Sequence, residues 1–189
     1  PVGATPINGA ATGLASPTVS IDFEEGAIPA STVVTTQFAG VTFGDGSNDF
    51  IMDTGGAGTG TQHIVGRFLQ SANTVVAPGA IKFDKQVSAA GFNLRTNPDT
   101  TTFTAFLNGV FVESFNAATN LTTSSNFYGF TGIIFDEIQF DMAIVGQQGF
   151  NLDNLEFVTV PAPSALFLIG AGLLGLGAMR RRRTAVSGK

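Results

Sequence analysis

Carboxylates are the side chains with which this chain could do chemistry, because it has one histidine and no cysteine. Two acidic groups stand at the ends of the region that reads as folded: IDFEE carries Asp22, Glu24 and Glu25, and NLDNLEF carries Asp153 and Glu156. Oxygen ligands without nitrogen or sulfur suit Ca²⁺. If the first and last strands of the fold are neighbours, as in many β-sandwiches, the two groups meet. We therefore predict a calcium site formed by Asp22, Glu24 and Asp153.

The predicted face of Asp153 supports this reading, since strand alternation places it with Leu155 and Phe157 on the buried side. A carboxylate buried there is costly unless it is paired, hydrogen-bonded or bound to a metal. The alternative is that Asp22 and Glu24 are solvated and that Asp153 is satisfied by hydrogen bonds alone. A second acidic group has the alternate spacing of a calcium loop and consists of Asp45, Ser47, Asp49 and Asp53. It lacks the glycine and glutamate of an EF-hand, which favours a solvated turn.

Catalytic constellations are absent from the sequence, so we predict that the protein is not an enzyme. His63 lies in a Gly- and Thr-rich segment, and there is neither a cysteine nucleophile nor a Gly-x-Ser-x-Gly elbow to accompany it. Asp136 and Glu137 are adjacent in one predicted strand and point to opposite faces, which does not suit paired-carboxylate catalysis. A secreted carbohydrate-active enzyme remains the less favoured alternative.

A hairpin over Thr101 to Phe115 is the clearest local signal, because Asn108-Gly109 suits the positive φ angles of a type I′ turn. This turn pairs Leu107 with Val110, Phe106 with Phe111, Ala105 with Val112 and Phe103 with Ser114. One face is then core, with Phe103, Ala105, Leu107, Val110 and Val112. The other face carries Thr104, Phe106, Phe111, Glu113 and Phe115. Phe106, Phe111 and Glu113 form a candidate sugar-binding platform, and the alternative is that the two phenylalanines are a buried cross-strand pair.

The elements that position these residues are short strands, separated by segments rich in Gly, Asn and Thr. The sequence predicts an all-β fold, an antiparallel β-sandwich of jelly-roll type, over residues 18–158. Residues 1–17 are small, uncharged and aperiodic and are expected to form a flexible leader. The expected strands are 18–24, 36–43, 50–52, 64–69, 81–83, 89–95, the two hairpin strands, 133–140 and 150–158.

Charge divides the chain into an acidic body and a basic end. All 14 carboxylates lie at or before Glu156, where the basic residues are only Arg67, Lys82, Lys85 and Arg95. An acidic body repels phosphate backbones, so we expect no nucleic-acid partner.

From Val160 onward the character of the sequence changes. Pro161-Ala162-Pro163 precedes an uncharged stretch from Ser164 to Met179, which as a helix spans about 24 Å. This is shorter than a hydrocarbon core of roughly 30 Å, and snorkelling arginines or local thinning can supply the difference. Four arginines, Arg180, Arg181, Arg182 and Arg183, then place residues 184–189 in the cytoplasm and the body outside. We predict a transmembrane helix within residues 160–183.

The order of these three features resembles the PEP-CTERM sorting domain of Gram-negative bacteria, with Ala162 where the family usually has Glu. The resemblance implies insertion in the inner membrane and processing by exosortase, a membrane protease thought to cleave near Pro161-Ala162-Pro163. It also implies export to the cell surface or extracellular matrix, and many proteins with this tail have β-sandwich bodies. IDFEE and NLDNLEF are similar to the ends of calcium-bearing carbohydrate-binding sandwiches. We therefore expect a non-catalytic surface protein that acts in adhesion or binds exopolysaccharide, or else a purely structural matrix protein.

Overall fold

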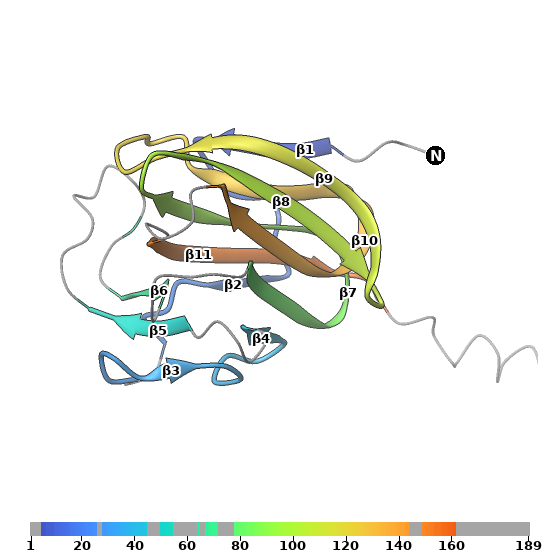
Figure 1. The fold of residues 1–189 in the computed structure, drawn as a ribbon. Coiled ribbons are helices and arrows are strands. Elements are labelled where there is room, and N and C mark those ends of the chain that lie inside the picture. The colour runs from blue at the N-terminus through green and yellow to red at the C-terminus, as the bar shows by residue number, and fades with distance from the viewer. Residues whose placement is uncertain are drawn as a thin grey trace, which may run out of the picture.

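A computed structural model describes residues 5–25, 28–44, 50–54, 64, 67–71, 78–143 and 149–161. Within these residues the chain is all-β, as predicted, and its strand pairings are antiparallel (Figure 1). The strands are β1 (Thr5–Ala10), β2 (Val19–Ile21), β3 (Val33–Val34), β4 (Val41–Phe43), β5 (Phe50–Asp53), β6 (Phe68–Ser71), β7 (Gly79–Thr96), β8 (Asp99–Leu107), β9 (Val110–Thr119), β10 (Phe127–Met142) and β11 (Phe150–Thr159). The described part of the chain contains no helix with the length and apolarity to span a membrane.

The long strands β7 and β10 organise the sheet, whose order is β3-β5-β6-β11-β7-β10-β8-β9. The first part of β10 lies between β1 and the end of β7, and its last part lies between β8 and the start of β7. The β7 strand likewise pairs with β4 near its start and with β11 near its end. Register shifts between Thr131 and Glu137 mark the place where the pairing changes. Strands that bend at such irregularities and pass between layers produce a sandwich-like body.

Both ends of the body are tied together, as the sequence led us to expect. The strand β2 pairs with β11, with Ile21 opposite Leu155, and Thr18 N donates to the Phe157 carbonyl at 2.9 Å. The leader prediction is wrong for Thr5–Ala10, which forms β1 and pairs with β10. Backbone hydrogen bonding at a sheet edge needs no apolar pattern, so the side chains of TPINGA did not reveal this strand. Jelly-roll connectivity stays a prediction.

Several strands differ in extent from the sequence prediction. The two expected strands 81–83 and 89–95 are parts of the single strand β7, and the expected strand 133–140 lies within the longer strand β10. Asp84, Lys85 and Gln86 are exposed and separate the apolar runs of β7, and the pairing with β10 is irregular there, although the strand continues. The hydrophobic pattern therefore predicted separate short strands where the structure has one long strand that continues through the bend.

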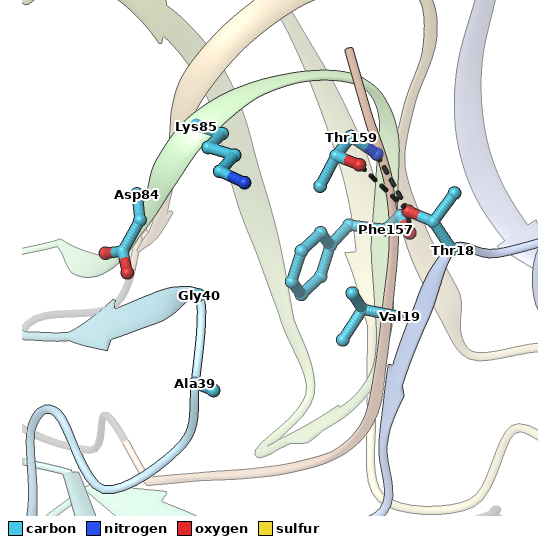
Figure 2. A pocket seen from close by; sticks show the side chains of 8 residues that line it. All are labelled: Thr18, Val19, Ala39, Gly40, Asp84, Lys85, Phe157 and Thr159. Atoms are coloured by element: carbon cyan, nitrogen blue, oxygen red, sulfur yellow. Dashed lines mark hydrogen bonds between the residues drawn. The ribbon is translucent and has the colours of Figure 1, made fainter. Parts of the chain in front are cut away.

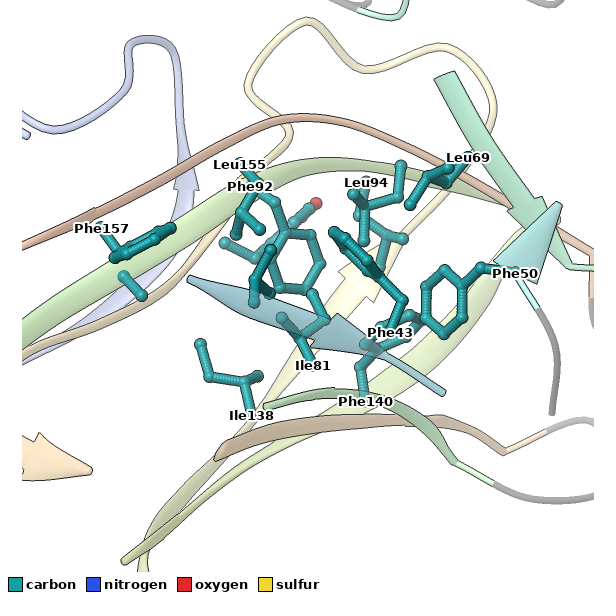
Figure 3. Packing of buried hydrophobic residues seen from close by; sticks show 14 of the residues in the cluster. Phe43, Phe50, Leu69, Ile81, Phe92, Leu94, Ile138, Phe140, Leu155 and Phe157 are labelled. Carbon is teal, nitrogen blue, oxygen red and sulfur yellow. The ribbon is translucent and has the colours of Figure 1, made fainter. Parts of the chain in front are cut away.

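The core is a connected network of aromatic rings between the layers (Figure 3). Phe140 lies at its centre, with ring centroids 5.4 Å from Phe92 and 5.0 Å from Phe150. Phe103 extends the network through a stacked contact with Tyr128 at 5.1 Å. Burial raises the pKa of the Tyr128 hydroxyl, which points to the Ala118 carbonyl at 3.4 Å. Each fully buried phenylalanine contributes about 1.5–3 kcal/mol relative to an exposed one, so these rings dominate the stability of the body.

Close backbone approach at Gly129 provides a test of how β7 and β10 are packed. A methyl group on Gly129 would lie 2.6 Å from Gly91 Cα and would meet the Ala90 carbonyl oxygen as well. Both obstacles are backbone atoms, which cannot move aside, so Gly129→Ala should destabilise the body by about 3 kcal/mol in urea unfolding, the upper end of the range for overpacking. Gly149→Ala is the control, because a methyl group there meets nothing within 4 Å, and its effect should be within about 0.5 kcal/mol. Equal midpoints for the two variants would contradict the described pairing.

Candidate functional site

The β8–β9 turn forms as the sequence predicts. Asn108 and Gly109 have φ angles of 51° and 76°, which are the positive values of a type I′ turn. The turn is held from the neighbouring strand, because Asn108 N donates to both carboxylate oxygens of Asp136 at 3.0 Å. Asp136 thus anchors the hairpin to β10.

The register beyond the turn corrects the predicted faces. Phe106 lies opposite Phe111 as expected, but a register shift follows, and Ala105 lies opposite Glu113 instead of Val112. Residues opposite each other in antiparallel strands share a face, so Glu113 lies on the side of the buried Ala105 and not with Phe111. The predicted grouping of Phe106, Phe111 and Glu113 on one face is therefore not formed.

The same shift moves Phe115 to the core face. It lies opposite Phe103, and the two rings stack with centroids 5.0 Å apart. The predicted pairing of Phe103 with Ser114 is wrong, and Ser114 lies opposite Thr104. One additional residue in β9 thus exchanges the faces of all side chains after it.

Exposure at the hairpin end contradicts the buried-pair interpretation. Phe111 is 60% exposed and Val110, which was expected in the core, is 66% exposed. The pairing of β10 with β8 reaches only as far as Phe106, opposite Glu137. Beyond Phe106 the hairpin has no paired residue in β10, although Asp136 still binds the turn at Asn108.

The outward face of the hairpin is polar and uncharged. Thr102 Oγ1 donates to Asn116 Oδ1 at 2.9 Å, and the next outward pair is Thr104 opposite Ser114. This face consists of hydroxyl and amide groups and leads toward Phe106 and Phe111 at the turn. Such groups can donate and accept hydrogen bonds without the desolvation cost of a charge.

The acidic residues of the predicted calcium site have separate hydrogen-bond partners. Asp22 is exposed and its Oδ1 accepts from Glu24 N at 3.0 Å, while Glu24 Oε1 accepts from Arg67 N at 2.6 Å. Asp153 is buried, and its Oδ1 accepts from Asn154 N at 2.7 Å. Among the described residues, no group of three or more His, Cys, Asp or Glu is placed to hold a metal ion. Calcium binding stays a prediction.

The face of Asp153 also differs from the prediction. Asp153 lies opposite Asn93, which alternates with the core residues Phe92 and Leu94, so both polar side chains leave the sheet away from the aromatic network. A register shift follows Asp153, and Asn154 has a φ of 49°. This irregularity returns Leu155 to the core side, which simple alternation could not anticipate.

Among the remaining candidate catalytic or ligand residues, the structure gives contacts for Glu137 and Asp53. Glu137 accepts from Gln139 Nε2 at 2.6 Å and lies 4.0 Å from Lys82 Nζ. Asp53, in β5, accepts from Thr54 N at 2.7 Å. Asp45, Ser47, Asp49 and His63 lie outside the described residues.

A pocket of about 410 Å³ beside the end of β11 was not anticipated from the sequence (Figure 2). Its walls come from four separate segments: Thr18 and Val19, Ala39 and Gly40, Asp84 and Lys85, and Phe157 and Thr159. Thr18 Oγ1 donates to the Phe157 carbonyl at 3.1 Å and accepts from Thr159 N at 2.9 Å. No short motif could have signalled a pocket assembled from positions so far apart.

The chain leaves the body close to this pocket. Val160 N donates to the Gln86 carbonyl at 2.8 Å, which holds the end of β11 against the bend of β7. Pro161 follows and is exposed. Ala162, Pro163, Arg180, Arg181, Arg182 and Arg183, together with the predicted transmembrane helix, lie outside the described residues.

Comparison with known proteins identifies this C-terminal segment. Residues 159–183 match the family model described as the PEP-CTERM protein-sorting motif. No curated protein sequence matches the chain. Among solved structures, the enzymatically active domain of bacteriophage CBA120 tailspike protein 4 is similar at 15% identity and a TM-score of 0.37, over 69% of this chain and 21% of that one. The chain spans about a fifth of that structure, and a likeness this weak supports no functional conclusion.

These findings define the class of protein as an antiparallel, sandwich-like β body that carries a C-terminal sorting signal. The chain carries a PEP-CTERM protein-sorting motif at residues 159–183, and this signal indicates export and membrane anchoring before processing by exosortase.

The Asp136 anchor leads to a prediction about the hairpin. Asp136→Ala removes a charged acceptor from the Asn108 amide and should lower the free energy of unfolding by about 1–2 kcal/mol. Asp141→Ala is the matched control, since Asp141 is an exposed carboxylate of the same strand. Amide exchange at Asn108 should accelerate only in the Asp136 variant, and unchanged exchange there would contradict the anchoring role.

Proposed function

We propose that this protein is a non-catalytic component of the cell surface or extracellular matrix, delivered there by exosortase processing of its C-terminal segment. The observation that carries the proposal is the position of the sorting motif. The motif begins at residue 159, and Thr159 is also the last residue of β11. Body and signal are therefore directly joined, so removal of the signal releases the body as a folded unit.

The charge distribution supports this topology. The arginines at 180–183 favour the cytoplasmic side of the inner membrane, while the acidic, β-rich body lies before the membrane segment and therefore outside. Cleavage near Pro161-Ala162-Pro163 would separate these two parts and allow the body to move to the cell surface.

The roles of the described carboxylates support a non-catalytic body. Asp136 binds the hairpin turn, Glu137 pairs with Gln139 and Lys82, and Asp153 accepts from the backbone. Each of these contacts stabilises local structure. These three carboxylates thus act as structural acceptors.

Adhesion through exopolysaccharide is the binding role that the outward face of β8 and β9 favours. Thr102, Thr104, Ser114 and Asn116 present hydroxyl and amide groups on one face of the two strands. Sugars are recognised by such groups because both partners donate and accept hydrogen bonds. Glu113, expected to take part, is on the other face. The carboxylate beside these groups is that of Asp141 in β10, which lies opposite Thr102.

Removal of the sorting segment tests the proposed export route. A chain ending at Pro161 retains the Val160–Gln86 hydrogen bond but loses the apolar stretch and the arginines. We expect the full chain to fractionate with membranes in cells blocked in exosortase, and the shortened chain to be released in soluble form. As a control for the apolar segment, Arg180–Arg183 replaced by serine should keep membrane association but lose its fixed orientation in protease protection. Identical fractionation of the full and shortened chains would contradict the proposal.

The binding role is tested by the double variant Thr104→Ala with Asn116→Ala. Loss of about 1 kcal/mol for each hydrogen bond should weaken retention on the polysaccharide matrix of the producing cell by about tenfold or more. Thr36→Ala removes a hydroxyl from an exposed loop residue and should leave retention unchanged. If the double variant binds as well as the parent, this face does not contact sugar and the structural-matrix role is favoured.

A further inference from the structure

Exposed apolar side chains gather at one end of the body. Among the described residues, the large apolar side chains with high exposure are Val33 in β3 and Val110, Phe111 and Ile134. The latter three, here called the hairpin-end patch, are 66%, 60% and 39% exposed. Val110 and Phe111 follow the β8–β9 turn, and Ile134 lies two residues before Asp136, whose carboxylate binds the turn at Asn108. Val110 and Phe111 are consecutive and leave the strand on opposite faces, so the three residues lie near the anchored turn but do not form a single face.

This end of the body is also where the chain departs toward the membrane. Val87 of β7 lies opposite Thr159 of β11 on one side and opposite Phe135 of β10 on the other. The end of β11 is thus two strand spacings, about 10 Å, from the residue next to Ile134. Figure 1 shows the β8–β9 turn and the end of β11 at the same extremity of the molecule.

The connection to the apolar stretch is short. Only residues 160–163 separate Thr159 from Ser164, where the uncharged stretch begins. Four extended residues reach about 13 Å, and each headgroup layer of a bilayer is roughly 5–8 Å thick. With the stretch in the membrane, the end of β11 cannot leave the vicinity of the bilayer. The hairpin-end patch is held there with it.

The surroundings of the patch indicate that the contact is apolar and not electrostatic. Lys85 and Asp84 lie at the bend of β7, Glu113 lies in β9 close to the turn, and the Asp136 carboxylate binds the turn itself. Charges of both signs give no net attraction to anionic lipid. Val110, Phe111 and Ile134 instead supply side chains whose transfer from water is favourable.

We propose that the hairpin-end patch inserts into the outer interface of the membrane that holds the sorting segment, before exosortase cleavage. This inference rests on the proposed export route. Insertion gives the body a second attachment besides the chain itself, and two points of contact fix its orientation. The extremity that carries Pro161 then faces the bilayer, where a membrane protease acts. Cleavage removes the stronger attachment, and the small patch does not retain the body by itself.

The absence of tryptophan allows a direct test on the full chain. Phe111→Trp places the only indole at the patch, and Val33→Trp places one at an exposed apolar position in β3 as the matched control. Both variants are reconstituted into phosphatidylethanolamine–phosphatidylglycerol vesicles. We expect blue-shifted emission, quenching by lipids brominated near the headgroup and at least threefold protection from acrylamide only for Phe111→Trp. Raising the salt concentration should leave these values unchanged.

Each contrary outcome has a distinct meaning. If the vesicles carry the chain but the Phe111→Trp indole is as open to acrylamide as the control, the inserted patch is wrong and the export route stands. If the chain does not float with the vesicles, the proposed export route fails. A shift produced by soluble exopolysaccharide without lipid would identify a sugar contact, and one that depends on protein density in the vesicles would identify contact between copies. Either of these results would overturn membrane insertion.

Discussion

Packing of phenylalanine rings between the layers is the interaction on which the rest of this structure depends. The chain has no cysteine and few charges, so neither disulfides nor ion-pair networks can hold it together. Phe140 contacts rings of β5, β7, β8 and β11 from a single position in β10. Edge-to-face and stacked contacts add to the burial of apolar area. Strands that are distant in sequence are thereby fixed in one arrangement.

The long strands β7 and β10 join the layers of the body. Because each strand pairs with different neighbours along its length, the body cannot separate into independent layers. The bend that joins the layers also brings together the end of β11, the β7 segment around Gln86 and the Asp136-anchored hairpin. The bend that joins the layers therefore places the exit of the sorting segment at the same end of the body as the exposed residues Val110 and Phe111.

Local irregularities in β9 and β11 decide which functional residues share a face. One additional residue in β9 separates Glu113 from Phe111, and the shift after Asp153 separates that carboxylate from Leu155. Glu113 and Asp153 therefore lie on the opposite faces of their strands from those that strict alternation predicts. The outward polar face of the hairpin consists of Thr, Ser and Asn side chains, whose regular pairing in β8 and β9 lies outside the irregularity.

The sequence by itself determined the all-β class, the type I′ turn at Asn108-Gly109, the pairing of Phe106 with Phe111 and the C-terminal sorting signal. These features depend on local chemistry: positive φ angles, strand periodicity, and the order of a proline motif, an apolar stretch and arginines. Only the tertiary structure decided the strand character of Thr5–Ala10, the faces of Glu113 and Asp153 and the exposure of Phe111. Those outcomes depend on which strand pairs with each segment and on how far that pairing extends. Pairing partners and bulges are set by packing between segments that are remote in sequence. The alternation of residues within a single strand therefore does not predict them.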